Sequence, residues 1–218
     1  YVDIEGAYRS EHELIKRYRE MALHPEVDKA IEDVVNEAIV TDLYDSPVEV
    51  ELSNLNASEG IKKKIREEFR YIKETMDFDK KSHEIFRNWY IDGRLYYLKV
   101  IDPKNPQEGI QDLRYIDPMK IKYIRQEKKS NIKDLTIRVK SEKENVPNPQ
   151  FDEYYLYTQK PNYPTGMIAQ AGKGATKISK DSITYCTSGL VDRNKNRVLS
   201  YLQKAIKALN QLRMIEDS

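Results

Sequence analysis

The sequence is poor in the residues on which disulfide-bonded domains and membrane spans depend. Its 218 residues include one cysteine, one tryptophan and eight glycines. Because Cys186 is alone, no disulfide can form within the chain, which indicates a reducing compartment. No apolar run approaches the roughly 18 residues that cross a bilayer. The sequence therefore predicts no membrane-spanning helix.

The sequence has only three histidines, so few side chains are available as metal ligands. His12, His24 and His83 stand in separate predicted helices, without a cysteine or paired acid at ligand spacing. Cys186 has no histidine near it in sequence, and a strand cysteine is more often a small core residue than a nucleophile. We therefore expect no metal, no cofactor and no enzyme activity. Three acids lie near helix ends or turns, where we expect their carboxylates to accept backbone hydrogen bonds and not to act in acid–base catalysis. They are Asp92, Asp102 and Asp117.

The segment from Gly166 to Gly174 is similar to a phosphate-binding loop but departs from its pattern. Five residues separate Gly166 from Gly172, whereas such a loop has four and follows its lysine with Ser or Thr. Here Gly174 follows Lys173. Two prolines and three glycines between Pro161 and Gly174 favour a plain flexible loop. A hydrolase that uses Lys173 remains a weak alternative.

Helical periodicity is abundant in the first 93 residues. Ser10 begins a capping-box pattern, and Pro25 suits the first turn of a second helix. Ser58 and Asp79 are expected to cap two more helices, the second of which ends at Gly93. The predicted helices are 10–23, 25–40, 59–78 and 79–93.

Beyond Gly93 the pattern changes to the alternation of strands, broken by turns at 102–106 and 117–118. Short strands that follow a block of helices are typical of an α+β fold with a small antiparallel sheet region. The predicted strands are 94–101, 110–116 and 119–125, then 132–139, 153–158 and 182–186, with an earlier alternating segment at 48–52. Most of the sixteen tyrosines are expected at core or half-exposed sheet positions.

The last segment predicts a long helix from about Lys195 to Ser218. Its apolar residues step by four and three, as in a seam that packs on another helix. They are Val198, Leu202, Ala205, Leu209 and Leu212. The helical pattern has not ended at Ser218, and the chain does not begin with Met, so we expect a piece of a longer protein.

The formal net charge of +1 conceals two segregated stretches. Residues 26–51 hold nine acids against Lys29, and residues 193–213 hold six bases and no acid. They are either solvated helix faces or an acidic and a basic surface that meet between neighbouring copies. The basic stretch also fits a nucleic-acid-binding module without sequence specificity. The candidate interface or DNA-facing residues are Glu32, Asp33, Glu37, Arg197, Lys204, Lys207 and Arg213.

Two long stretches resemble the portal proteins of T-even-type tailed bacteriophages. They are residues 21–40 (MALHPEVDKAIEDVVNEAIV) and 198–217 (VLSYLQKAIKALNQLRMIED). Residues 92–97 and 113–118 also match the family's pattern. The sequence departs from it at Gln203 and Ala208, where the family has His and Pro.

The resemblance implies a non-enzymatic subunit of a dodecameric ring at one capsid vertex, through which DNA is packaged and ejected. It implies a short N-terminal extension (1–9), a wing domain (10–193) and a truncated helix that leads into the stem (194–218). The implied partners are other copies of the chain, the major capsid protein, scaffold proteins, the packaging terminase, neck and tail proteins, and double-stranded DNA bound non-specifically. The implied location is the virion, after assembly in the host cytoplasm near the inner membrane.

Overall fold

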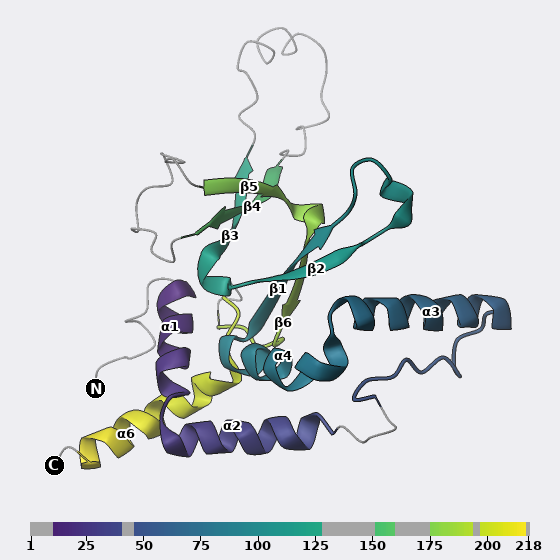
Figure 1. Ribbon diagram of the computed structural model, residues 1–218. Helices are drawn as coiled ribbons and strands as arrows, with labels where there is room; N and C mark the ends of the chain where they lie inside the picture. Colours follow the sequence, from purple (N-terminus) through teal and green to yellow (C-terminus); the bar gives the residue numbers. More distant parts are fainter. Residues whose placement is uncertain (1–10, 41–45, 128–150, 160–174, 194–196, 217–218) are drawn as a thin grey trace, which may run out of the picture. The chain divides into compact units, whose positions relative to one another are not determined.

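The computed structural model describes residues 11–40, 46–127, 151–159, 175–193 and 197–216, and these have the predicted α+β fold (Figure 1). The chain divides into two units. The first comprises Tyr1–Met119 and Thr184–Ser218, and the second comprises Lys120–Ile183.

The first unit contains the four predicted N-terminal helices. Pro25 is the first residue of the second helix, and Ser58 occupies the N-cap position of the third, as the sequence predicts, although its side chain makes no capping hydrogen bond. Ser10, the first residue of the predicted capping box, lies outside the described residues. The observed helices are α1 (Glu11–Met21), α2 (Pro25–Ala38), α3 (Glu59–Thr75) and α4 (Phe78–Asp92).

The break between α3 and α4 is at Asp77, so the prediction that Asp79 caps α4 is wrong. Asp77 has φ 52°, in the left-handed region that Asp tolerates better than most residues. Its carbonyl accepts the first hydrogen bonds of α4, from the N–H groups of Lys80 and Lys81. At the other end, Gly93 has φ 71° and its N–H donates to the Trp89 carbonyl at 2.8 Å, which confirms the predicted stop.

A three-stranded sheet with the order β2-β1-β6 follows the helices. The strands are β1 (Arg94–Val100), β2 (Asp112–Ile116) and β6 (Ile183–Thr187), close to the predicted ranges. β1 and β2 are antiparallel, with Tyr96 opposite Ile116 and Val100 opposite Asp112. The connection between these two strands includes a short 3-10 turn, η1 (Pro106–Glu108).

The second unit holds an antiparallel sheet with the order β3-β4-β5. Its strands are β3 (Ile121–Glu127), β4 (Phe151–Thr158) and β5 (Ala175–Ser179), the last of which was not predicted as a separate strand. Tyr123 and Tyr155 lie opposite each other, with ring centroids 5.4 Å apart. The strand predicted at 132–139 and the glycine segment 166–174 lie outside the described residues.

The strand predicted at 48–52 is wrong, although the alternation that suggested it is present. Val48 and Val50 are half-buried, Glu49 and Glu51 are exposed, and Leu52 is buried. The segment belongs to neither sheet of the described structure. Alternating burial in an extended loop thus produced the same pattern as a half-buried strand.

The last helix begins later than predicted. Leu199 donates to the Leu190 carbonyl at 2.8 Å, and Val198 forms an isolated bridge with Val191, so this part is extended. A 3-10 turn, η5 (Tyr201–Ala205), follows and leads into α6 (Ile206–Glu216). Backbone pairing with Leu190 and Val191 therefore replaces the start of the expected helix.

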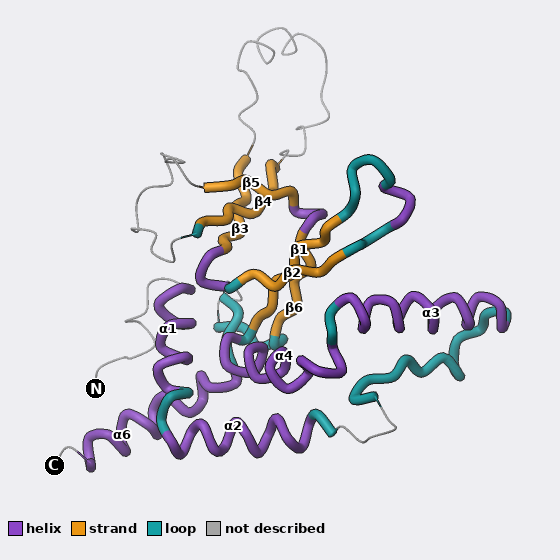
Figure 2. Tube along the Cα trace, viewed as in Figure 1, coloured by secondary structure: helices purple, strands orange, loops and turns teal. Residues whose placement is uncertain are grey.

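The main core lies where α1, α2, α4, η5 and α6 meet, and these elements lie together in the first unit (Figure 2). Tyr18 and Met21 are fully buried there. The predicted seam of the last helix packs on this core of its own chain, while Leu212 is 37% exposed. The buried core residues are Leu14, Tyr18, Met21, Ala22, Ile31, Val35, Ile91, Leu202, Ile206 and Leu209.

Candidate interaction surfaces

The acidic candidates lie on the outward side of α2. Glu32, Asp33 and Glu37 are all exposed, while Ile31 and Val35 of the same helix are buried. The 3.6-residue period of the helix separates the two sets. The predicted acidic segment therefore forms a solvent-facing surface along α2.

The basic candidates fall into two groups. Lys204 in η5 and Lys207 in α6 are exposed. Arg197 and Arg213 are half-buried, and the Arg213 guanidinium contacts His24 Nε2 at the start of α2. The four residues therefore do not form one continuous basic row.

Besides the contact of Arg213 with His24, α6 and α2 meet within one chain through apolar side chains. Ile31 and Val35 share a core with Leu202, Ile206 and Leu209. The candidate acids of α2 and the lysines of the last helix are exposed, on the other sides of these helices. Each charged surface is thus presented to solvent.

Two polar contacts fix η5 and α6 on α1. The Tyr18 hydroxyl donates to Gln203 Oε1 at 2.6 Å, and Arg17 Nη2 donates to Asn210 Oδ1 at 2.6 Å. Burial raises the pKa of the Tyr18 hydroxyl, which therefore stays a donor. These contacts orient η5, which carries Lys204, and α6, which carries Lys207.

A second junction joins the end of α4 to the segment before η5. Arg94 is 2% exposed, donates to the Val198 carbonyl at 2.5 Å and pairs with Glu11 at 3.1 Å. Ser200 is fully buried, its hydroxyl donates to the Tyr90 carbonyl at 2.9 Å, and it accepts from the Leu202 N–H at 3.0 Å. Sequence reasoning missed this junction, because the helix end and the segment before η5 lie more than a hundred residues apart along the chain.

A charged cluster ties α1 to one end of the first sheet, where α4 leads into β1 and where β2 ends. Arg19 forms two hydrogen bonds with Asp92, at 2.9 and 2.7 Å, and pairs with Asp117 at 2.7 Å. Burial raises the pKa of the Asp92 carboxyl, although Arg19 opposes this. Asp117 also accepts from the Met119 N–H, and Asp102 from the Lys104 N–H, each at 2.9 Å, so their predicted backbone role is confirmed. Asp92 instead serves an ion pair with Arg19.

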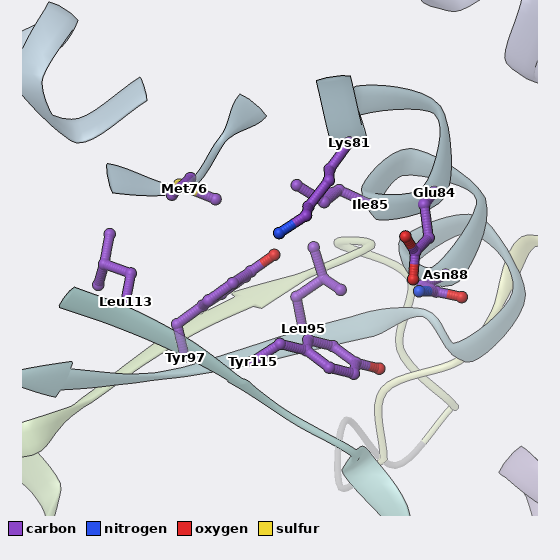
Figure 3. Close-up of a pocket in the computed structure, with 9 residues that line it drawn as sticks. All are labelled: Met76, Lys81, Glu84, Ile85, Asn88, Leu95, Tyr97, Leu113 and Tyr115. Atoms are coloured by element: carbon purple, nitrogen blue, oxygen red, sulfur yellow. The ribbon is translucent and has the colours of Figure 1, made fainter. Parts of the chain in front are cut away.

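A shallow cavity of about 210 Å³ lies between α4 and the β1–β2 pair (Figure 3). Leu95, Tyr97 and Leu113 line it from the strands, while Lys81 and Glu84 reach it from α4. Burial, and next Glu84, raises the pKa of Tyr97 to about 12. The lining of this cavity is therefore mixed, with apolar side chains beside an ammonium, a carboxylate and a phenol.

The histidines and the cysteine considered as metal ligands or as a nucleophile do not form a common site in the described structure. His24 contacts Arg213, and His83 lies in α4. Within the described ranges, no three His, Cys, Asp or Glu side chains are grouped to hold a metal. Cys186 is exposed, so the expectation that it is a core residue is wrong. Across those same ranges, none of the helices has the length and apolar content that crossing a membrane requires.

Tyrosines fill the sheets as predicted. Tyr96 and Tyr155 are buried, while Tyr115, Tyr123 and Tyr185 are 40–42% exposed. Tyr96 and Tyr185 stack with ring centroids 4.6 Å apart.

The described residues form a mixed α+β fold. Its buried polar side chains join helices and strands, and its candidate charges lie on separate exposed surfaces. The chain belongs to the family described as bacteriophage T4-like portal protein (Gp20), whose model matches residues 11–218.

Two relatives agree with this assignment. The chain is 36% identical over 210 residues to the portal protein of Vibrio phage KVP40, covering 94% of this chain. It is 29% identical over 226 residues to the portal protein of Salmonella phage ViI, covering 100% of this chain. It spans 39% of the length of each of these two relatives.

Proposed function

We propose that this chain is part of a subunit of the phage portal ring at the unique capsid vertex. The family match across residues 11–218 carries the proposal. In this role the ring conducts double-stranded DNA into and out of the head and supports the packaging terminase. It also initiates prohead assembly with scaffold and capsid proteins, and later joins the neck and tail. The division into wing (10–193) and stem entry (194–218) stays a prediction.

The charge distribution supports a conduit. Tight binding to the phosphate backbone requires many accessible cations, and it would slow the passage of DNA. The chain has a net charge of only +1, and Arg197 and Arg213 are half-buried. α6 therefore lacks the uninterrupted row of exposed bases that a nucleic-acid-binding module would use.

The exposed charges support a contact between neighbouring subunits. In this contact, Glu32, Asp33 and Glu37 of one copy face Lys204 and Lys207 of the next. The two surfaces lie on different helices, and a head-to-tail ring joins unlike surfaces. Opposite charge steers such association and disfavours wrong partners.

Charge reversal in the full-length protein tests both the ring and this contact. Light scattering after size exclusion should show rings for the unchanged protein. The Lys204→Glu/Lys207→Glu variant should raise the concentration needed for half-assembly about tenfold, because like charges then face each other. Adding Asp33→Lys and Glu37→Lys should restore assembly.

Lys104→Glu is the matched control, because Lys104 is an exposed lysine in the β1–β2 connection. Equal assembly of the control and the double reversal would refute the charged contact. A full-length protein that stays monomeric at every concentration would refute the portal-ring function itself.

A further inference from the structure

Polar contacts from the end of α4 and the start of β1 hold the segment that leads into η5. The buried Arg94 guanidinium donates to the Val198 carbonyl at 2.5 Å. Two residues later, the Ser200 hydroxyl donates to the Tyr90 carbonyl at 2.9 Å. The same oxygen accepts from the Leu202 N–H at 3.0 Å, so one fully buried side chain joins α4 to the first turn of η5. These contacts fix both the place and the direction in which η5 begins.

The apolar core under η5 holds this element without fixing its direction. Leu202, Ile206 and Leu209 are buried among the helices of the first unit. Apolar burial depends on area and not on angle, so it tolerates small shifts of these side chains. Hydrogen bonds, in contrast, weaken steeply when donor and acceptor are misaligned. A 3-10 helix also has poor internal hydrogen-bond geometry, so the orientation of η5 depends on contacts outside it.

η5 and α6 carry one of the two charged surfaces that are proposed to meet between subunits. Lys204 in η5 and Lys207 in α6 are exposed, and the acidic surface lies on α2. In a head-to-tail ring, the angle between the two unlike surfaces of one subunit sets the rotation from each copy to the next. This rotation is about 30° for a ring of twelve and about 28° for a ring of thirteen. A change of about 2° in the direction of η5 is therefore enough to change the number of copies at which the ring closes.

We propose that Arg94 and Ser200 are positioning residues that set the number of copies in the ring. The inference rests on the proposed ring function and on its charged contact between subunits. Both side chains are buried, so they act through η5, whose Lys204 meets α2 of the next copy. With both residues in place the rings have one number of copies, and without their hydrogen bonds the rings have several.

Native mass spectrometry of the full-length protein tests the role of Ser200, because it counts the copies in each ring. Ser200→Ala should still form rings, but the share of rings that are one copy larger or smaller should rise about fivefold, since both hydrogen bonds of the hydroxyl are lost. Ser82→Ala is the matched control. Ser82 is equally buried in α4, and its hydroxyl has no hydrogen-bond partner among the described residues, so its loss should leave the ring sizes unchanged.

A second variant tests the contact from Arg94. Arg94→Lys keeps a positive charge for Glu11, which pairs with the guanidinium at 3.1 Å. The planar guanidinium reaches Glu11 and the Val198 carbonyl together, whereas a single ammonium lacks this fork. Arg94→Lys should therefore broaden the distribution of ring sizes as Ser200→Ala does.

A loss of stability alone should not broaden the distribution. Ile116→Val shortens a buried side chain of β2, which belongs to neither charged surface, so it should lower the Tm and leave the number of copies unchanged. Equal broadening by Ile116→Val and Ser200→Ala at an equal fall in Tm would show that Ser200 only stabilises the fold. That result would overturn the proposal.

The remaining outcomes separate this inference from the function on which it rests. Rings that keep one number of copies in both Ser200→Ala and Arg94→Lys would refute the positioning role alone. So would rings of several sizes from the unchanged protein. A full-length protein that forms no rings would refute the proposed ring function as well.

Discussion

At Gly93 the end of α4 approaches the backbone of the segment that leads to α6. A Cβ atom at this position would lie 2.6 Å from the Leu199 carbonyl oxygen and 2.9 Å from its carbon. The N–H of Ser188 donates to the Gly93 carbonyl at 2.8 Å, so the glycine cannot easily move away. The left-handed φ of 71° adds a conformational reason for glycine.

Replacing Gly93 by Ala should therefore lower the free energy of unfolding by about 3 kcal/mol, the sum of left-handed strain and a backbone clash. Gly189→Ala is the matched control. Gly189 has φ 77°, but no described atom lies within 4 Å of where its Cβ would be, so Ala should cost only about 1 kcal/mol there. Calorimetric unfolding at equal protein concentration measures both. Equal losses would show that the approach of Leu199 contributes nothing.

Tyr97 gives a pH-dependent prediction at the same scale. Its pKa is raised from 10.0 to about 12 in the folded protein, chiefly by burial. Between these two values the unfolded chain loses the proton while the folded chain keeps it. The contribution of Tyr97 to stability is therefore fully present below pH 10 and is lost as the pH rises through 12.

From pH 9 to pH 11, the free energy of unfolding should therefore fall by about 1 kcal/mol less in Tyr97→Phe than in the unchanged protein. The comparison cancels the titration of lysines and other tyrosines, which is common to both proteins. Urea unfolding at the two pH values measures the difference. Parallel losses in the two proteins would mean that Tyr97 titrates as in water.

At the scale of elements, local patterns predicted the helices well. The apolar periods and the residues Pro25, Ser58 and Gly93 correctly placed α2, α3 and the end of α4. Local pattern failed in the segment before η5, where a short-range bridge and a hydrogen bond from Arg94, 104 positions away, decide the backbone. Val198 bridges to Val191, so a segment with a helical pattern is extended instead. Residues 48–52 alternate in burial but belong to neither described sheet.

The candidate surfaces show the same limit. The exposure of Glu32, Asp33 and Glu37 follows from the period of α2, which the sequence contains. The contact of Arg213 with His24 joins residues 189 positions apart, and no local signal marks it. Arg19 likewise meets Asp92 across 73 positions. A count of basic residues therefore overstated how many of them the last segment presents to a partner.

At the scale of the whole molecule, the balance of charge predicts how strongly the affinity of the protein for DNA depends on salt. Each lysine that contacts a phosphate adds about 0.9 to the slope of log affinity against log salt. Lys204 and Lys207 are proposed to face a neighbouring subunit, so they should contribute nothing to that slope. Lys204→Gln/Lys207→Gln should leave it unchanged, because neutral glutamine removes the charges without adding repulsion.

Fluorescence anisotropy with a labelled DNA duplex, at several salt concentrations and with rings intact, measures the slope for the full-length protein. A fall of about two in the variant's slope would show that both lysines contact phosphate. The last segment would then act as a nucleic-acid-binding surface, and the charged contact between subunits would have to be abandoned. If the slope is unchanged and the Lys204→Glu/Lys207→Glu variant assembles poorly, the two lysines contact a neighbouring subunit. The same two side chains would then act on protein and not on DNA.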